Sequence, residues 1–190
     1  MTPRAKFLAL IGIFLVPTLA SFTAFYFFPP SKTTNYGTLI SPVVLLPQTV
    51  LARIDTDKQV MDPALRGKWL IVTRDSGECE ATCQKKLYAM RQARLILGRE
   101  QDRVLRVVLV DDATRPSDAL QEKYEGTIWV AAKSSPWLAA LPAPKEDTSG
   151  RESLYAVDTM GNIFMRYNAD PDIKRLATDL QRVLKASQIG

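Results

Sequence analysis

Two cysteines, Cys79 and Cys83, are the residues of this sequence best suited to chemistry, and the sequence has no others. Residues four apart in a helix have Cα atoms about 6 Å apart, within the range that a disulfide accepts. Backbone N–H groups and the helix dipole stabilise a thiolate at a helix N-terminus. We therefore expect the pair to cycle between dithiol and disulfide, with Cys79 as the more exposed, attacking thiol and Cys83 as the resolving thiol.

The same two sulfurs suit a soft metal ion, and Cu(I) is the ion that two thiolates and few other ligands favour. Zinc normally takes four ligands, and the sequence offers neither a further cysteine nor any histidine. The lack of histidine also excludes Ser-His-Asp and Cys-His catalysis within this chain.

The charges around the cysteines act in opposite directions. Asp75, Glu78 and Glu80 raise a nearby thiol pKa and attract cations, whereas Lys85 and Lys86 lower that pKa. The sequence does not determine whether their combined effect raises or lowers the thiol pKa. Two inert alternatives, core packing of free cysteines and a fixed structural disulfide, weigh as much as redox chemistry on spacing alone, because C-x-x-x-C is a weaker signal than C-x-x-C.

The elements that must position the cysteines are a strand before them and a helix after them. Residues 68–73 form a nearly continuous apolar run, which is typical of a strand buried on both faces. A loop over 74–78 leads into a helix predicted over 79–97 and ended by Gly98. Residues at steps of three or four give this helix one inward face: Cys79, Cys83, Leu87, Met90, Ala93 and Leu97.

The remaining pattern predicts one α/β domain. After an extended or edge segment over 36–51, the later elements are strand 104–110, helix 117–125, strand 127–130, helix 136–141, a polar loop over 142–150, a hairpin of 154–158 with 163–167, and a last helix capped by Asp170-Pro171. This order of elements predicts a thioredoxin-like domain with a central mixed sheet.

The N-terminal 22 residues from Phe7 to Phe28 carry no charge, enough for a helix to cross a hydrocarbon core of about 30 Å. The apolar run continues beyond the small residues at 20–24, which favours an uncleaved transmembrane anchor over an export signal. Arg4 and Lys6 then place the short N-terminus in the cytoplasm. We expect a basic flank (1–6), an anchor (7–28), a linker (29–35) and a thioredoxin-like domain (36–190), in the periplasm if the source is bacterial.

The net charge of +5 is too small to indicate a nucleic-acid partner. One group of basic residues is interpreted as a solvated helix face, because no aromatic residues are interleaved with it: Lys85, Lys86, Arg91, Arg94, Arg99, Arg103 and Arg106.

Several motifs resemble the Sco/SenC family of membrane-anchored, thioredoxin-like proteins that help to assemble the copper centre of cytochrome c oxidase. The matching positions are Cys79, Cys83, Leu87 and Met90 in the cysteine helix, Asp112 with Arg115 after the next strand, and Tyr155 to Asp158 followed by Gly161. Two positions depart from the family: Gln84 replaces a proline, and no histidine stands near 150–153, where the family has a copper ligand.

The resemblance implies a protein of the bacterial inner membrane that assists cytochrome c oxidase assembly, by thiol–disulfide reduction or by handling Cu(I) through Cys79 and Cys83. Its partners would be membrane lipid and either an oxidase subunit or another copper or redox assembly protein. The alternative is a scaffold that has lost catalysis. A peroxidase or glutathione-type enzyme is a weaker hypothesis, because the signature around a single reactive cysteine is absent.

Overall fold

The computed structural model describes residues 2–27, 34–54, 56, 59–61 and 65–187. Within these, the chain forms two compact units, Met1–Thr34 and Asn35–Gly190. The first consists of α1 (Pro3–Phe27), a 25-residue helix apolar enough to cross a membrane. Its length of about 37 Å exceeds a hydrocarbon core of about 30 Å. Phe28 and most of the predicted linker lie outside the described residues, so this division stays a prediction.

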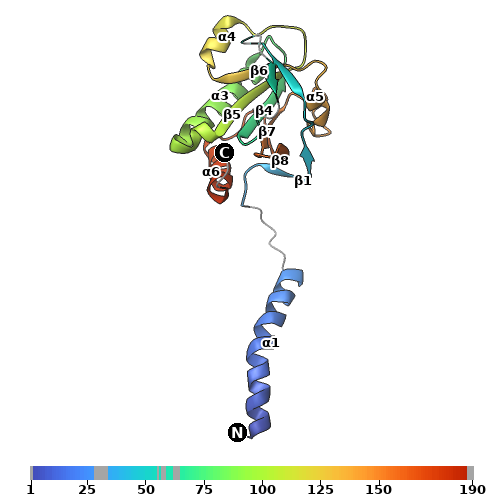
Figure 1. The fold of residues 1–190 in the computed structure, drawn as a ribbon, viewed down its shortest axis with the longest axis vertical. Helices are drawn as coiled ribbons and strands as arrows, with labels where there is room; N and C mark the ends of the chain where they lie inside the picture. The colour runs from blue at the N-terminus through green and yellow to red at the C-terminus, as the bar shows by residue number, and fades with distance from the viewer. Residues whose placement is uncertain (1, 28–33, 55, 57–58, 62–64, 188–190) are drawn as a thin grey trace. The chain divides into compact units, whose positions relative to one another are not determined.

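The second unit is built on a mixed eight-stranded sheet in the order β1-β8-β7-β4-β5-β6-β2-β3 (Figure 1). Strands β4, β5 and β6 are parallel, and the other pairs are antiparallel. The strands are β1 (Thr38–Leu45), β2 (Val50–Arg53), β3 (Gln59–Met61), β4 (Trp69–Asp75), β5 (Val104–Val110), β6 (Thr127–Ala131), β7 (Ser153–Val157) and β8 (Asn162–Asn168). The mixed sheet agrees with the prediction, and β1 is an edge strand as expected.

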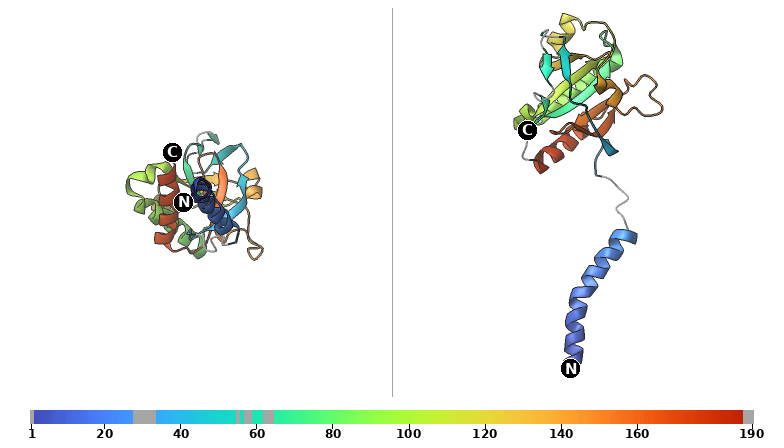
Figure 2. Two further views of the ribbon diagram at one scale, coloured as in Figure 1. Left: turned by 90° about the horizontal axis from the view of Figure 1, so that it is seen from below. Right: turned by 45° about the vertical axis from the view of Figure 1, so that its right-hand side comes forward.

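Helices cover both faces of the sheet (Figure 2). They are α3 (Ala81–Ile96), η1 (Gly98–Arg103), α4 (Asp118–Lys123), α5 (Pro136–Ala140) and α6 (Ile173–Ala186). Helices α3 and α6 pack on one face, whereas Trp137 of α5 belongs to the core on the other face. The last helix is capped by Asp172, whose side chain accepts a hydrogen bond from Arg175 N, so the predicted Asp170-Pro171 cap was wrong by two residues.

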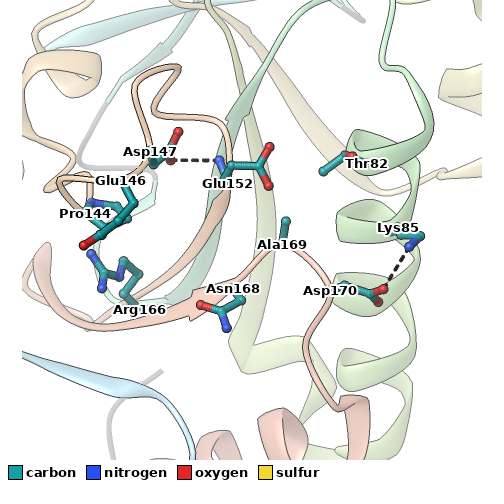
Figure 3. Close-up of a pocket in the computed structure, with 10 residues that line it drawn as sticks. All are labelled: Thr82, Lys85, Pro144, Glu146, Asp147, Glu152, Arg166, Asn168, Ala169 and Asp170. Carbon is teal, nitrogen blue, oxygen red and sulfur yellow. Dashed lines mark hydrogen bonds and ion pairs between the residues drawn. The ribbon is translucent and has the colours of Figure 1, made fainter.

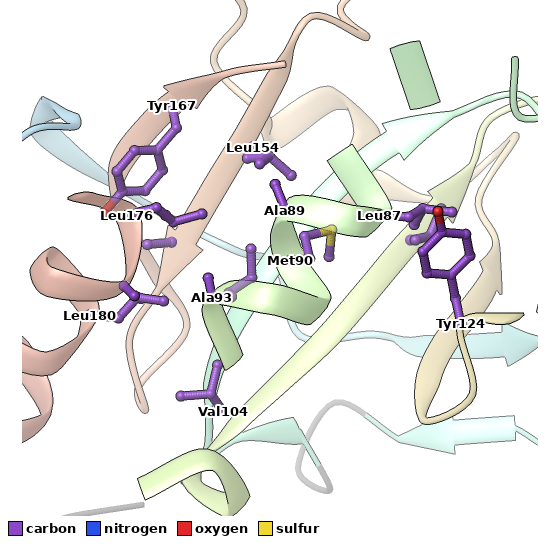
Figure 4. Packing of buried hydrophobic residues seen from close by; sticks show 14 of the residues in the cluster. Leu87, Ala89, Met90, Ala93, Val104, Tyr124, Leu154, Tyr167, Leu176 and Leu180 are labelled. Atoms are coloured by element: carbon purple, nitrogen blue, oxygen red, sulfur yellow. The ribbon is translucent and has the colours of Figure 1, made fainter. Parts of the chain in front are cut away.

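The site depends on the packing of α3 against the middle of the sheet. Its inward residues Leu87, Met90 and Ala93 are at most 1% exposed and contact a core that also contains Val104 and Leu176 (Figure 4). Burying such side chains stabilises the fold by about 1.5–3 kcal/mol for each large one. This packing fixes the start of α3, where the cysteines lie, relative to the ends of β4 and β5.

Two of the basic residues predicted to be solvated are buried instead. Lys86 is fully buried, and Arg106 is only 5% exposed. Arg106 donates to the carbonyl of Glu125, while its Nε and Nη1 have no partner among the described residues. Burial, followed by repulsion from Arg94 and Arg91, lowers the pKa of Arg106 to about 10. The interpretation as one solvated face was wrong for these two positions.

Asp179 of α6 fixes the beginning of the second unit. Its buried carboxylate accepts hydrogen bonds from the backbone N–H groups of Tyr36 (2.8 Å) and Gly37 (2.9 Å). The Tyr36 ring also lies under the Arg175 guanidinium, at 4.6 Å. Gly37 passes so close to Met165 and Tyr167 that a Cβ would lie 2.5–2.6 Å from their side chains, so any other residue there would force these side chains to move.

Replacing Asp179 with alanine should lower the free energy of unfolding by about 2–4 kcal/mol, because a buried and a partly buried N–H group lose a charged acceptor. Urea unfolding of the full chain in neutral detergent measures this. The matched control is Asp170→Ala, which removes an exposed ion pair with Lys85 and should cost less than about 1 kcal/mol. Equal losses in the two variants would show that the Asp179 anchor contributes no special stability.

Candidate redox site

Cys79 and Cys83 form a disulfide, with Cα atoms 5.0 Å apart. Helix α3 begins at Ala81 with Glu80 as its N-cap, so Cys79 precedes the helix, contrary to the predicted start at residue 79. Cys79 has a left-handed backbone with φ of +47°, which is uncommon for a residue with a side chain. Cys83 occupies the first turn, where free backbone N–H groups stabilise a thiolate.

The two cysteines are equally buried, each with 1% of its surface exposed. The expectation that Cys79 is the more exposed thiol was therefore wrong. Its left-handed turn brings Cys79 back into the core cluster beneath α3. Cys83, in contrast, forms part of the wall of a surface hollow of about 460 Å³, which we call the sulfur hollow.

The sulfur hollow is strongly acidic. Five carboxylates and a single guanidinium are present among its lining residues, which are Asp75, Ser76, Glu78, Glu80, Thr82, Cys83, Asp112, Thr114, Ser149, Arg151 and Glu152. Negative charge disfavours a thiolate and raises a thiol pKa, opposing the effect of the helix N-terminus. The acidic lining thus favours the disulfide over the ionised dithiol.

Asp112 positions the loop that carries Cys79. Its Oδ1 accepts hydrogen bonds from Gly77 N (3.1 Å) and Thr114 N (3.0 Å), which joins the loop after β4 to the loop after β5. A Cβ on Gly77 would lie 1.8 Å from the Thr114 carbonyl oxygen, so no other residue fits this contact. The spacing of Asp112 and Arg115 had singled out this carboxylate, but its contact with the cysteine loop was not foreseen.

Lys86, a buried residue of α3, links the segments that form the walls of the sulfur hollow. Its buried ammonium group contacts Asp75 Oδ2 (2.7 Å) and donates to the carbonyls of Arg74 (2.9 Å) and Arg151 (2.5 Å). Burial lowers the pKa of Lys86, and the attraction of Asp75 offsets only part of this effect. One side chain of α3 thereby connects the end of β4 to the loop before β7.

Asp111 joins the same two segments by a second set of contacts. Its carboxylate accepts hydrogen bonds from Nε and Nη2 of both Arg74 (3.1 and 3.0 Å) and Arg151 (3.0 and 2.6 Å). Burial alone would raise the pKa of Asp111, but the hydrogen bonds and charges of Arg151 and Arg74 outweigh it, so that the pKa is lowered. Arg151 is therefore held in the wall of the sulfur hollow.

The donor set does not fit a three-ligand copper site. The sequence contains no histidine, and Arg151 and Glu152 line the hollow where the resembling family would place one. No group of three or more His, Cys, Asp or Glu side chains in the described part of the chain is arranged to hold a metal ion. After reduction, the sulfurs of Cys79 and Cys83 would be the only soft donors of this site, which suits transient Cu(I) cargo at most.

Comparison with known proteins supports the fold. The sequence model of the family described as "Transmembrane-like, thioredoxin-like, C-terminal domain" matches residues 69–187. Comparison with curated protein sequences finds no match. The predicted thioredoxin-like fold is confirmed.

Solved structures that share the fold do so at low sequence identity. Apo Sco1 from Thermus thermophilus has a TM-score of 0.62 and 17% identity, covering 81% of this chain and 99% of that one. Copper-bound yeast Sco1 has a TM-score of 0.60 and 15% sequence identity, and the match covers 76% of this chain and 94% of that one. A peroxiredoxin Q variant from Xanthomonas campestris has a TM-score of 0.52 and 13% sequence identity, and the match covers 75% of this chain and 97% of that one.

Replacing Lys86 with methionine should lower the free energy of unfolding by about 3–5 kcal/mol, because Asp75 is left as an unpaired buried charge. Chemical denaturation of the full chain measures this. The exposed neighbour Lys85→Met is the control, with an expected loss below about 1 kcal/mol. The double variant Lys86→Met/Asp75→Leu should regain part of the loss, and strict additivity of the two single effects would contradict a coupled pair.

Stability should fall in acid as Asp111 is protonated. Its pKa is lower in the folded chain than its ordinary value of 3.8, so its contribution is complete above about pH 5 and is lost as the pH falls through the folded pKa. In urea unfolding between pH 7 and 2.5, Asp111→Asn should be less stable than wild type at pH 7 and should depend less on pH below 5. Asp118→Asn should keep the wild-type slope, and an unchanged slope in Asp111→Asn would exclude this role.

Proposed function

Because this chain belongs to the transmembrane-like, thioredoxin-like C-terminal domain family, we propose that it is a membrane-anchored thiol–disulfide exchange protein whose working group is the Cys79–Cys83 pair. In the reduced protein, one cysteine thiolate attacks a partner disulfide and forms a mixed disulfide. The second cysteine then attacks that bond. The partner leaves as a dithiol, and two electrons have passed from this protein to its partner.

The observation that carries this proposal is the position of the sulfurs: they are bonded to each other, and Cys83 lies at the start of a helix in the wall of an accessible hollow. The acidic lining favours one direction of electron transfer, from the cysteine pair to its partner. Because the carboxylates destabilise thiolates more than a neutral disulfide, they favour the oxidised form of the pair. A couple that favours its disulfide is a reductant of other disulfides.

We place this reaction outside the cytoplasm, on the periplasmic side of a bacterial inner membrane. Helix α1 supplies an anchor long enough to span the bilayer, and Arg4 and Lys6 near its start favour a cytoplasmic N-terminus. The substrate that we propose is a disulfide in a subunit of cytochrome c oxidase or in another copper or redox assembly protein. The likeness of the fold to Sco1 and the match of the cysteine motif support this choice.

One observation favours a second candidate, a thioredoxin-like scaffold without catalysis. Each cysteine is only 1% exposed, so a partner reaches the sulfurs only through the sulfur hollow or after movement of the loop that carries Cys79. The scaffold role requires no reversible dithiol couple, whereas the exchange role does. Redox titration therefore separates the two.

Equilibration of the full chain with thiol buffers should show one two-electron couple, with two free thiols in the reduced protein and none in the oxidised protein. Cys79→Ser and Cys83→Ser should each abolish the couple. In cells that depend on the protein, each substitution should also impair oxidase assembly, measured from the oxidase copper and haem spectra. If the protein stays folded and its disulfide is not reduced at any potential that thiol buffers can reach, the exchange role is excluded and only the scaffold role remains. Anaerobic titration of the reduced chain tests whether Cu(I) is also a cargo.

Neutralising the acidic lining should make the pair more oxidising. We expect Glu78→Gln/Glu80→Gln to raise the midpoint potential by about 10–30 mV, because a change of 30 mV corresponds to about one pKa unit of differential charge interaction. The control is Glu100→Gln/Asp102→Asn, which removes the same charge beyond the far end of α3 and should leave the potential unchanged. A potential that falls in the test variant would show that the carboxylates do not act as described.

A further inference from the structure

A second hollow adjoins the sulfur hollow. It has a volume of about 630 Å³ and is lined by Thr82, Lys85, Pro144, Glu146, Asp147, Glu152, Arg166, Asn168, Ala169 and Asp170 (Figure 3). Thr82 and Glu152 line both hollows, Thr82 from the start of α3 and Glu152 from the loop before β7. We call the two hollows together the trough. Each lies within the size range of ligand sites, about 300–1,000 Å³.

The charges of the trough are unevenly distributed. At the far end, Lys85 pairs with Asp170 (2.9 Å), and Arg166 lies near the carboxylate of Glu146 (Figure 3). The carboxylate of Asp147 in the same lining accepts hydrogen bonds from Ser149 Oγ and Glu152 N. At the sulfur end, the lining Arg151 already binds Asp111, and the buried Lys86, which lies outside the lining, binds Asp75. Glu78, Glu80 and Glu152 are exposed there and form no ion pair with any described residue. The unbalanced charge is therefore negative, and most of it lies beside Cys83.

We propose that the trough receives the cysteine-bearing segment of the redox partner, in extended form, and that this segment carries lysine or arginine next to its cysteine. This inference rests on the proposed exchange function and adds the kind of partner. The unpaired carboxylates attract a cationic segment and repel an anionic one, so they select the substrate by charge. An anionic thiol such as glutathione is disfavoured by the same charges.

The wall of the trough also determines which sulfur reacts first. Cys83 borders the sulfur hollow, and Cys79 is not among the described residues that line either hollow. In the reverse half of the exchange, which restores the dithiol of this protein, an incoming thiolate therefore attacks Cys83 Sγ, the Cys79–Cys83 bond breaks, and Cys79 leaves as a thiolate that takes up a proton from water. A second thiol then attacks the mixed disulfide. Two thiols are oxidised to a disulfide, and the protein disulfide is reduced to a dithiol.

Two capped peptides of opposite charge, acetyl-KGCGK-amide and acetyl-EGCGE-amide, provide the test. Each is mixed with the oxidised full chain in neutral detergent, and the second-order rate of disulfide reduction is compared at equal thiolate concentration. We expect the cationic peptide to react at least about tenfold faster at low ionic strength. This preference should nearly vanish in 1 M salt, where the Debye length is about 3 Å.

Glu80→Gln/Glu152→Gln should reduce the preference to below about threefold, while Glu100→Gln/Asp102→Asn should retain it. Acid quenching followed by peptide mapping should locate the first adduct on Cys83. Circular dichroism confirms that each variant is folded.

Equal rates for the two peptides, or an adduct on Cys79, would overturn the inference while leaving exchange by this pair intact, provided that dithiothreitol reduces the disulfide of the folded chain. A disulfide that dithiothreitol also fails to reduce would overturn the proposed function and the inference with it.

Discussion

The buried ammonium group of Lys86 is the interaction on which the rest of the site depends. It fills all three of its donor positions, one with a carboxylate and two with backbone carbonyls from separate segments. A charge taken out of water at this depth costs several kcal/mol unless such contacts offset the cost. Because these contacts come from β4 and from the loop before β7, the ion pair fixes the relative positions of three walls of the sulfur hollow. The geometry around the disulfide follows from that.

Around this centre the chain separates stability from reactivity. Asp111 with its two arginines and Lys86 with Asp75 form two sets of ion pairs in which each carboxylate is matched by at least one cation of the protein. The carboxylates of Glu78, Glu80 and Glu152 are not used in this way and lie exposed beside the reactive sulfur. The ion-paired residues maintain the shape of the site, whereas the exposed carboxylates create a negative electrostatic potential that acts on an incoming molecule. A fold shared with Sco1 proteins and with a peroxiredoxin thus gains its own selectivity from surface carboxylates.

The sequence was sufficient to predict the elements whose pattern is local. The apolar runs of β4 and β5, the inward face of α3 and the hairpin of β7 and β8 could be read directly, because burial and turn chemistry act over a few residues. The role of Lys86 could not be predicted from the sequence, because its two carbonyl acceptors belong to residues 12 and 65 positions away. The loop before Cys79 is held in the same way by Asp112, whose carboxylate accepts a hydrogen bond from Gly77 N, 35 residues away. Long-range polar contacts of this kind leave no periodic signal.

The anchoring of Tyr36 and Gly37 by Asp179 has a mechanical consequence. These residues are the entrance of the chain into its second unit, and their N–H groups are tied to α6 rather than to a neighbouring strand. A pull on the N-terminal side of Tyr36 is therefore borne first by a helix that packs directly on α3. The edge strand β1 begins only after these two residues, so a force applied at this point would act on α6 and the neighbouring cysteine helix before it acted on the edge of the sheet.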